Sequence, residues 1–343
     1  MNVQRGVALA PYTTLRVGGP AARFVECTAE DEVVAAVTAA DDTAEPVLVL
    51  GGGSNLVVSD DGFAGTVVRV LTAGEDVRPD GDLVHVTWQA GETWDDLVAR
   101  CVDEGFAGIE FLSGIPGLVG ATPIQNVGAY GQEVAETIEA VRVLDRRTAN
   151  VVELTPAECR FAYRNSVFKG DDRYVVLAVT FALRLGRESA PVRYAEVART
   201  LGVEEGARVP IDAAREVVLE LRGGKGMVLT EDDHDTWSAG SFFTNPLVTA
   251  DVAAALPSGA PRWPAPDGRV KVSAAWLIDR SGFGKGYGSG FAKISTKHTL
   301  ALTNRGGATT SDVLTLAREV RDGVRASFGI ELTPEPVLVG EKL

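Results

Sequence analysis

The stretch LGGGSNLVVSD, residues 50–60, ends a short apolar run and then presents three consecutive glycines, Gly51, Gly52 and Gly53. Glycine allows positive φ and lets a backbone approach a ligand closely, so that neighbouring N–H groups can converge on an anion. A tight turn between two strands would use the same residues, and a lone glycine triplet leaves both interpretations open. The chain contains neither G-x-G-x-x-G nor G-x-x-x-x-G-K-[ST], so we expect neither a standard Rossmann site nor a P-loop.

A second stretch, SGIPGLVGATPIQNVGAYG (113–131), is also rich in glycine. After its first serine it holds five glycines and two prolines, its polar side chains include Gln125 and Asn126, and its only ionisable group is Tyr130. A surface loop normally carries charges. An uncharged, glycine-dense stretch of this length favours backbone laid against a large flat ligand. Two such loops, both following strands, predict a nucleotide-like cofactor.

Composition limits the classes of protein that remain. A length of 343 residues favours two or three domains, and 45% hydrophobic with 23% charged residues is typical of a soluble globular protein. The net charge of −14 argues against a nucleic-acid binder but not against small anions. Three separated cysteines without a CxxC indicate a reducing compartment and no metal site. No apolar run approaches the roughly 18 residues of a membrane helix, and we expect a cytoplasmic protein without membrane contact.

Periodicity predicts alternating strands and helices. The predicted strands are 23–29, 46–50, 65–70, 83–91, 138–145 and 174–185. The predicted helices are 30–42, 93–105, 212–222 and 310–329. The first elements form a βαβ rhythm typical of a small α/β unit. For the last helix we expect Thr310 or Ser311 as the cap and Gly329 as the stop. We expect the stretch 225–237 to be flexible and the tail 330–340 to be a strand interrupted by prolines.

Six motifs in register carry a specific resemblance. They are TTLRVGGPA (13–21), LGGGSNLVVSDDGFAGTVV (50–68), SGIPGLVGATPIQNVGAYG (113–131), FAYRNSVFK (161–169), AGSFFTNP (239–246) and PEPVLVG (334–340). In this order and at these separations, the chain resembles the UDP-N-acetylenolpyruvoylglucosamine reductase (UDP-N-acetylmuramate dehydrogenase) family of peptidoglycan precursor synthesis. The resemblance covers essentially the whole chain.

The resemblance implies an α+β protein. Its expected parts are a vanillyl-alcohol-oxidase/PCMH-type FAD-binding fold of two α/β subdomains (1–70 with 331–343, and 71–222) and a C-terminal α+β substrate-binding domain (223–330). In this fold FAD lies between the two glycine loops without a Rossmann fingerprint. The residues implied to contact noncovalent FAD are Gly51, Gly52, Gly53, Ser54, Asn55, Ile115, Pro116, Gly117, Gly120, Ala121, Gln125, Asn126, Gly128, Ala129 and Tyr130.

The family reaction implies three catalytic residues. NADPH is the reductant, and the hydride reaches the terminal CH₂ of the enolpyruvyl ether, so negative charge builds on the α-carbon and its carboxylate. Arg164 matches the family's arginine, although a typical arginine is a surface residue. Glu335 matches its glutamate, which we expect to share a proton or to pair with a cation. Ser241 matches its proton donor, and a strongly basic carbanion equivalent needs no histidine to activate that hydroxyl.

Four further positions are implied to bind UDP-N-acetylglucosamine enolpyruvate. Tyr194 fits a loop tyrosine that covers the diphosphate in one subgroup, although the sequence around it is not distinctive. Lys225 fits a lysine that follows Arg222 by three residues, and Asn245 is expected to meet the uridine diphosphate. His298 lies where the family contacts substrate. We expect the protein to act as a monomer.

Three other functions are alternatives to this one. A flavin oxidase of the same domain type would explain the glycine loops but not AGSFFTNP or PEPVLVG, and neither loop has the His or Cys that a covalent flavin link needs. A UDP-sugar-binding regulator would be favoured if Arg164, Ser241 or Glu335 were missing, and all three are present. A hydrolase is poorly supported, because no G-x-S-x-G occurs and His234 is weak evidence for a dyad with Ser241.

Overall fold

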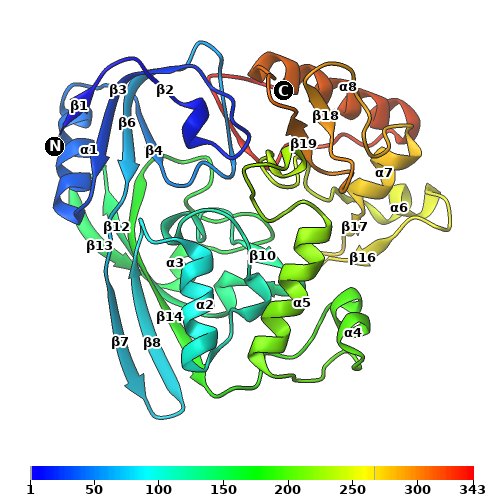
Figure 1. Cartoon of the computed structure of the whole chain (residues 1–343), viewed down its shortest axis with the longest axis horizontal. Coiled ribbons are helices and arrows are strands. Elements are labelled where there is room, and N and C mark those ends of the chain that lie inside the picture. The colour runs from blue at the N-terminus through cyan, green and yellow to red at the C-terminus, as the bar shows by residue number, and fades with distance from the viewer. Residues whose placement is uncertain (1, 266) are drawn as a thin grey trace. The chain divides into compact units, whose positions relative to one another are not determined.

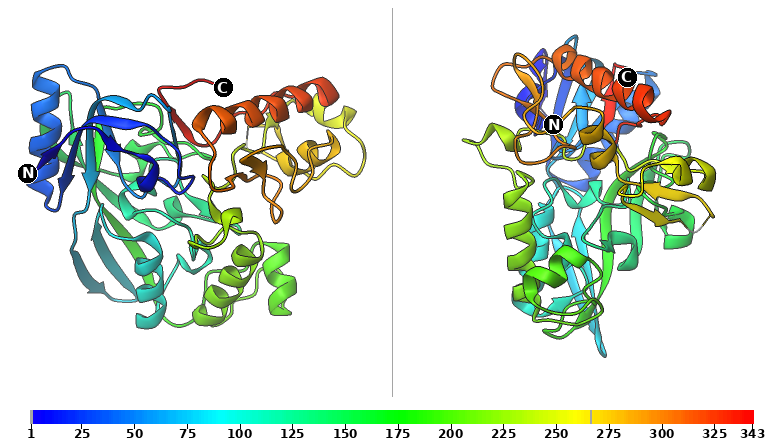
Figure 2. Two further views of the ribbon diagram at one scale, coloured as in Figure 1. Left: turned by 45° about the horizontal axis from the view of Figure 1, so that its top comes forward. Right: turned by 90° about the vertical axis from the view of Figure 1, so that its right-hand side faces the viewer.

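The structure is a computed structural model that describes residues 2–265 and 267–343, and the chain divides into two compact units (Figures 1 and 2). Unit 1 contains the residues up to Val7, Ala21–Gly52 and Ala64–Gly224, and unit 2 contains Ala8–Pro20, Gly53–Phe63 and Lys225–Leu343. The division into three domains that we expected stays a prediction, because the two FAD-binding subdomains are not separated here.

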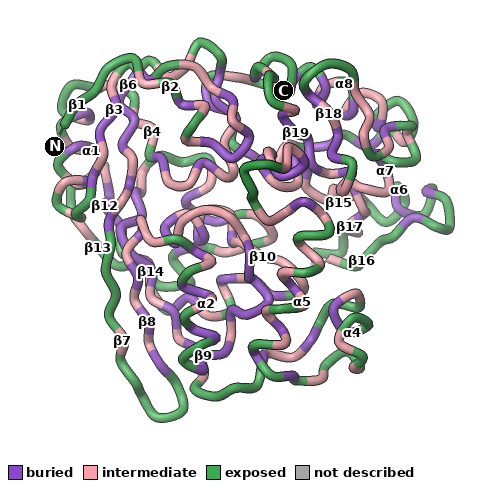
Figure 3. Tube along the Cα trace, in the orientation of Figure 1, coloured by how far each residue is buried: buried purple, intermediate pink, exposed green. Residues whose placement is uncertain are grey.

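The larger sheet of unit 1 is antiparallel and is built around one long strand. Its order is β13 (Asn150–Leu154), β12 (Ile138–Asp145), β14 (Tyr174–Leu185), β8 (Leu83–Gln89), β7 (Glu75–Asp80), with β9 (Phe106–Ala107) also paired to β14. The β14 sequence YVVLAVTFALRL is an apolar run that suits a covered strand, and most of it is buried, whereas β7 is mostly exposed (Figure 3). The predicted strands 138–145 and 174–185 are confirmed.

A smaller sheet begins the chain. Its order is β1 (Val3–Gln4), β3 (Pro20–Cys27), β6 (Phe63–Val70), β4 (Val47–Leu50), with β2 (Val7–Ala8) also paired to β3. Between β3 and β4 in sequence lies α1 (Glu30–Asp42), which confirms the predicted helix 30–42. Three acidic residues in its first turn complement the helix dipole, and Val33, Ala36, Val37 and Ala40 are buried at helical spacing.

The other α-helices described in unit 1 are α2 (Trp94–Glu104), α3 (Pro156–Cys159), α4 (Ala195–Leu201) and α5 (Ile211–Gly224). α2 and α3 contact strands of the larger sheet, whereas α4 packs on α5. α2 ends at Gly105, whose φ of 77° is the left-handed conformation that favours glycine. The Trp94 ring packs 5.7 Å from that of Phe181 on β14, and its Nε1 donates to Leu112 O at 3.0 Å. These two contacts connect α2 to the sheet and to the residue that directly precedes the second glycine loop.

Within the described residues, unit 2 consists of short strands and three α-helices. The strands are β5 (Leu56–Val58) parallel to β20 (Val337–Val339), the antiparallel set β15 (Leu247–Val248), β17 (Val270–Val272), β16 (Arg262–Pro264), and the hairpin β18 (Ala292–Ile294) with β19 (Leu302–Asn304). The helices are α6 (Ala250–Ala255), α7 (Ala274–Arg280) and α8 (Thr310–Phe328), and α8 packs on the β18–β19 hairpin (Figure 2). The tail is a strand only over β20, because the prolines before it cannot donate to a ladder.

The start of α8 differs from the prediction by one residue. The cap is Thr309, whose hydroxyl accepts from Asp312 N, and not Thr310 or Ser311. The N–H groups of Thr310 and Ser311 instead donate to the Asp60 carboxylate, at 2.8 and 2.9 Å. The last residue of LGGGSNLVVSD therefore caps this helix from outside. The predicted stop, Gly329, is confirmed with φ 66°.

Among the described residues, no helix is both long enough and apolar enough to span a membrane.

We predict that Asp60→Ala lowers the stability of the protein by about 1 kcal/mol, because two helix N–H groups lose their acceptor and the dipole loses a nearby negative charge. The measurement is the thermal transition midpoint, compared with Asp61→Ala, which removes the adjacent exposed carboxylate. An Asp60→Ala midpoint equal to that of Asp61→Ala would contradict the capping role.

Candidate functional site

The first glycine loop meets the second with bare backbone. A Cβ on Gly52 would lie 2.8 Å from the Cα of Gly117, closer than real Cβ contacts allow. A Cβ on Gly51 would meet only the Leu118 side chain, at 3.4 Å. The structure therefore brings the two predicted cofactor loops together within unit 1, and the contact requires glycine at position 52.

Gly53 is required for a different reason. Its φ is +60°, and a Cβ there would lie 2.0 Å from the Tyr12 carbonyl oxygen. Two residues later, Asn55 O accepts from Val337 N at 2.9 Å and Asn55 Nδ2 donates to Glu335 O at 3.4 Å. Gly52 and Gly53 are thus needed by the protein backbone itself. The ligand-facing role of the loop, which the sequence left open, stays a prediction.

The second glycine loop is anchored along its length. Gly117 O accepts from Trp94 N at 3.1 Å, and Gly120 N donates to Ala90 O at 3.0 Å. A Cβ on Gly120 would lie 2.5 Å from that of Ala90, so this glycine serves packing. The loop is held as a rigid platform by the residues that precede and begin α2.

Asp95 in α2 fixes the start of the same loop. Its carboxylate accepts from Gly114 N at 2.5 Å and binds both terminal nitrogens of Arg215 in α5, at 2.6 and 2.9 Å. Burial raises the pKa of Asp95, but the Arg215 guanidinium and the Gly114 N–H outweigh burial and lower the pKa below its usual value. The charged carboxylate therefore links two helices to the loop.

The predicted cofactor residues differ in how accessible they are. Gly53, Gly120 and Asn126 are buried. The half-buried ones are Gly51, Gly52, Ser54, Asn55, Ile115, Pro116, Gly117, Ala121, Gln125, Gly128, Ala129 and Tyr130. The half-buried positions carry no charged side chain and are partly accessible, which is compatible with a flat ligand.

The Asn126 side chain serves the loop itself. Asn126 has a φ of 47°, and its amide donates to Glu133 Oε2 at 2.7 Å and to Ala162 O at 3.2 Å while its oxygen accepts from Ala135 N at 3.1 Å. These bonds stabilise a left-handed conformation that costs energy outside glycine. The cofactor contact predicted for Asn126 would therefore be made by its backbone, because its side chain is bonded within the protein.

Arg164 is fixed against the second glycine loop. Its guanidinium donates to Asn126 O at 3.3 Å and to Gly128 O, and its Cζ lies 5.4 Å from the centre of the Tyr163 ring. The side chain is 19% exposed and therefore mostly buried, unlike that of a typical surface arginine. With its own φ at 51°, Arg164 presents a permanent positive charge at the loop in a preset orientation.

Tyr194 lies at the same loop. Its ring meets that of Tyr130 edge-on, with centroids 5.4 Å apart. Burial raises the pKa of Tyr130 to about 12, so Tyr130 stays a neutral hydroxyl. Tyr194 is itself 42% exposed and precedes α4. The structure thus brings a residue from a weak motif match into contact with the predicted cofactor loop.

The segments that carry Ser241 and Glu335 are paired within unit 2. Glu335 N donates to Phe242 O at 2.9 Å, and Phe243 and Pro334 form an antiparallel bridge. Both functional residues are half-buried. The segments AGSFFTNP and PEPVLVG therefore lie side by side, with Asn55 bonded to the second of them. A hydroxyl and a carboxyl lie on adjacent strand-like segments although they are almost a hundred residues apart.

The remaining substrate candidates belong to unit 2. Asn245 Oδ1 accepts from Ala274 N at the start of α7, at 2.9 Å, which leaves its NH₂ group as the donor for a ligand. His298 lies in the loop between β18 and β19, and Lys225 is the first residue of the segment Lys225–Leu343 of unit 2. Both residues are half-buried. Across residues 2–265 and 267–343, no three His, Cys, Asp or Glu side chains are grouped to hold a metal ion.

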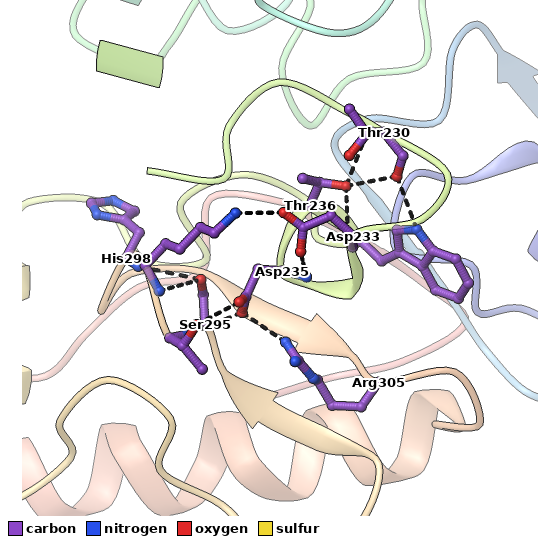
Figure 4. Close-up of polar contacts among 10 residues, drawn as sticks. Thr230, Asp233, Asp235, Thr236, Ser295, His298 and Arg305 are labelled. Atoms are coloured by element: carbon purple, nitrogen blue, oxygen red, sulfur yellow. Dashed lines mark hydrogen bonds and ion pairs between the residues drawn. The ribbon is translucent and has the colours of Figure 1, made fainter. Parts of the chain in front are cut away.

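A polar network in unit 2 was missed by sequence reasoning. The stretch 225–237 was expected to be flexible, but Asp233 pairs with Lys297 at 2.5 Å and Asp235 pairs with Arg305 at 2.7 Å (Figure 4). Burial raises the pKa of Asp235, but hydrogen bonds from Thr296 and the charge of Arg305 outweigh it and lower the pKa. A dense acidic run usually indicates a solvated loop, so the sequence offered no signal for this network.

Known proteins share this arrangement. Residues 232–339 match the family described as UDP-N-acetylenolpyruvoylglucosamine reductase, C-terminal domain, and residues 21–155 match the FAD binding domain family. The UDP-N-acetylenolpyruvoylglucosamine reductase of Streptomyces avermitilis is 60% identical over 98% of this chain and 94% of its own length. That of Thermobifida fusca is 57% identical over 99% and 98%. The crystal structure of the Thermus caldophilus enzyme aligns with a TM-score of 0.70 and 28% identity, covering 99% of both chains.

These findings confirm the predicted fold class, an FAD-binding fold joined to a C-terminal domain, and the resemblance drawn from the six motifs. Because relatives of this kind match it over nearly its full length, the chain belongs to the UDP-N-acetylenolpyruvoylglucosamine reductase family.

Proposed function

We propose that this protein reduces UDP-N-acetylglucosamine enolpyruvate to UDP-N-acetylmuramate in the cytoplasm, with NADPH as reductant and noncovalent FAD, as a monomer. The product would serve peptidoglycan synthesis, and with it cell shape and division. The observation that carries the proposal is the pairing of AGSFFTNP with PEPVLVG, which holds the Ser241 hydroxyl and the Glu335 carboxyl on bonded segments. Family membership at 60% identity supports the same substrate.

The residues of unit 1 fit a flavin. Gly52 and Gly117 meet without side chains, and the positions around them are half-buried and uncharged apart from Arg164. Neither glycine loop contains a His or Cys for a covalent link. When bound, FAD supplies hydride transfer between NADPH and the terminal CH₂ of the enolpyruvyl group. The loop backbone binds and orients it there.

The side chains of the protein would then act on the substrate. Charge that develops on the α-carbon spreads into the adjacent carboxylate, and the Arg164 guanidinium is a donor suited to such an oxygen-rich anion. Loop carbonyls already orient this guanidinium, so little reorganisation is required. Ser241 would deliver the proton from Oγ to the α-carbon. Glu335, protonated or paired with a cation as expected from the sequence, would lie on the neighbouring segment without repelling the anion.

The first functional prediction concerns charge stabilisation. Arg164→Ala and Glu335→Gln should lower turnover more than they weaken substrate binding. The reason is that both residues are expected to stabilise charge that develops only in the transition state. Steady-state kinetics separates turnover from KM. Matched controls are Arg160→Ala, an exposed arginine that also has positive φ, and Glu331→Gln, an exposed glutamate of the same tail. A higher KM with unchanged turnover would show that Arg164 and Glu335 only bind substrate.

The second functional prediction concerns the proton. Ser241→Ala should leave bleaching of the flavin by NADPH nearly intact, because that half-reaction needs no protein acid. Recolouring by the enolpyruvyl substrate should slow by roughly 10²- to 10⁴-fold, as for a lost general acid, and Ser241→Cys should recover part of the rate. Stopped-flow absorbance measures both phases.

Ser281→Ala, which removes a half-buried hydroxyl at the end of α7, is the control. Recolouring at the wild-type rate in Ser241→Ala would exclude Ser241 as the proton donor, and equal slowing of both phases would make it a structural residue.

A further inference from the structure

One buried carboxylate binds the β18–β19 hairpin, whose loop carries His298. The Asp235 side chain is 7% exposed. Its Oδ1 accepts from Thr296 N at 2.9 Å and from Arg305 Nη1 at 2.7 Å, and its Oδ2 accepts from the Thr296 hydroxyl at 2.5 Å (Figure 4). Thr296 is the second residue of the loop that joins β18 to β19, and Arg305 directly follows β19. The carboxylate therefore binds the hairpin at two places, one on each side of β19.

The loop is itself ordered by short-range bonds. Ser295 Oγ accepts from the N–H groups of Lys297 and His298, at 3.0 and 3.2 Å, and Lys297 reaches Asp233 at 2.5 Å. Two aspartates of one short segment thus hold successive parts of the loop. The bonds of Ser295, Asp233 and Asp235 together set where the backbone of His298 lies.

The same hairpin holds the segment that contains Ser241. Ser238 and Thr303 form an antiparallel bridge, and Phe242 N donates to Leu300 O at 2.7 Å. Ser241 lies between these two attachments. Its position is therefore coupled to the β18–β19 hairpin, which Asp235 binds through Thr296 and Arg305.

A buried ion pair is weak evidence for stability, because desolvation offsets much of its attraction. Charge-assisted hydrogen bonds are short and directional, however, and a carboxylate with three of them fixes geometry. Catalytic groups need such support, since a misplacement of about 1 Å can cost roughly 10²-fold in rate.

We propose that Asp235 is a positioning residue for the proposed reaction, which fixes Ser241 and the His298 loop through Thr296 and Arg305. It rests on the proposed function and adds a residue that none of the six motifs marks. Its effect falls on the half-reaction that uses Ser241 and not on reduction by NADPH.

The test is stopped-flow absorbance on the flavin-loaded full-length protein, with saturating NADPH and then saturating enolpyruvyl substrate. In Asp235→Asn the rate constant for recolouring should fall by roughly 10- to 100-fold, while that for bleaching stays within about 2-fold of the wild type. Rate constants of single turnovers do not depend on how much enzyme is folded, so lower stability alone does not produce this split. Thr296→Val, which keeps the volume and removes one donor, should show the same split with a smaller loss.

Asp145→Asn is the matched control, because Asp145 is equally buried and its ion pair with Arg173 joins the end of β12 to the residue before β14 in unit 1, whereas Ser241 and His298 belong to unit 2. Wild-type recolouring in both Asp235→Asn and Thr296→Val would overturn the proposal, and so would equal slowing of both phases or the same split in Asp145→Asn. If Asp235→Asn does not fold, the result with Thr296→Val decides. A wild-type protein that the substrate does not recolour would instead refute the proposed function.

Discussion

The close approach of Gly52 to Gly117 is the constraint on which the cofactor side of this protein depends. Two loops separated by more than sixty residues pass each other with no room for a methyl group between them. Hydrogen bonds nearby hold the second loop in place. Gly117 O and Gly120 N are bonded to the backbone at and before the start of α2, and Asp95 accepts from Gly114 N at the start of the loop. Arg164 donates to two carbonyl oxygens of the same loop. In the proposed function, a flat ligand lies on this backbone and is selected by shape and peptide dipoles and not by charged side chains.

Unit 2 achieves its geometry by a different means. Short segments from distant parts of the chain are bonded to one another, with Phe242 joined to Glu335 and to Leu300, and Asn55 joined to the segment of Glu335. None of these segments is a long regular strand, so the precision comes from side-chain anchors such as Asp235. This is consistent with chemistry that needs a placed hydroxyl and no metal or activated nucleophile, because a basic α-carbon takes a proton readily from a neutral donor.

Much of the fold could be predicted from sequence where one strong pattern dominated. The helix 30–42 and the strands 138–145 and 174–185 have clear apolar periodicity. The strand Glu75–Asp80 reads EDVRPD, a charged edge without that signal. The candidate site residues came from motif resemblance, and their roles stay predictions. What sequence could not indicate were tertiary uses of polar groups: the Asp60 cap of α8, the internal bonds of Asn126, and the buried Asp235 in an acidic stretch.

The central claim, that two bare-backbone loops hold the flavin, is tested most directly by titrating FAD into flavin-stripped protein. The wild type should bind FAD reversibly. In Gly52→Ala, overpacking against Gly117 by about 1–3 kcal/mol should weaken affinity by roughly 10- to 100-fold, while Gly259→Ala, where a Cβ meets nothing within 4 Å, should bind like the wild type. Wild-type FAD affinity in a folded Gly52→Ala protein, or no binding by the wild type, would contradict the account.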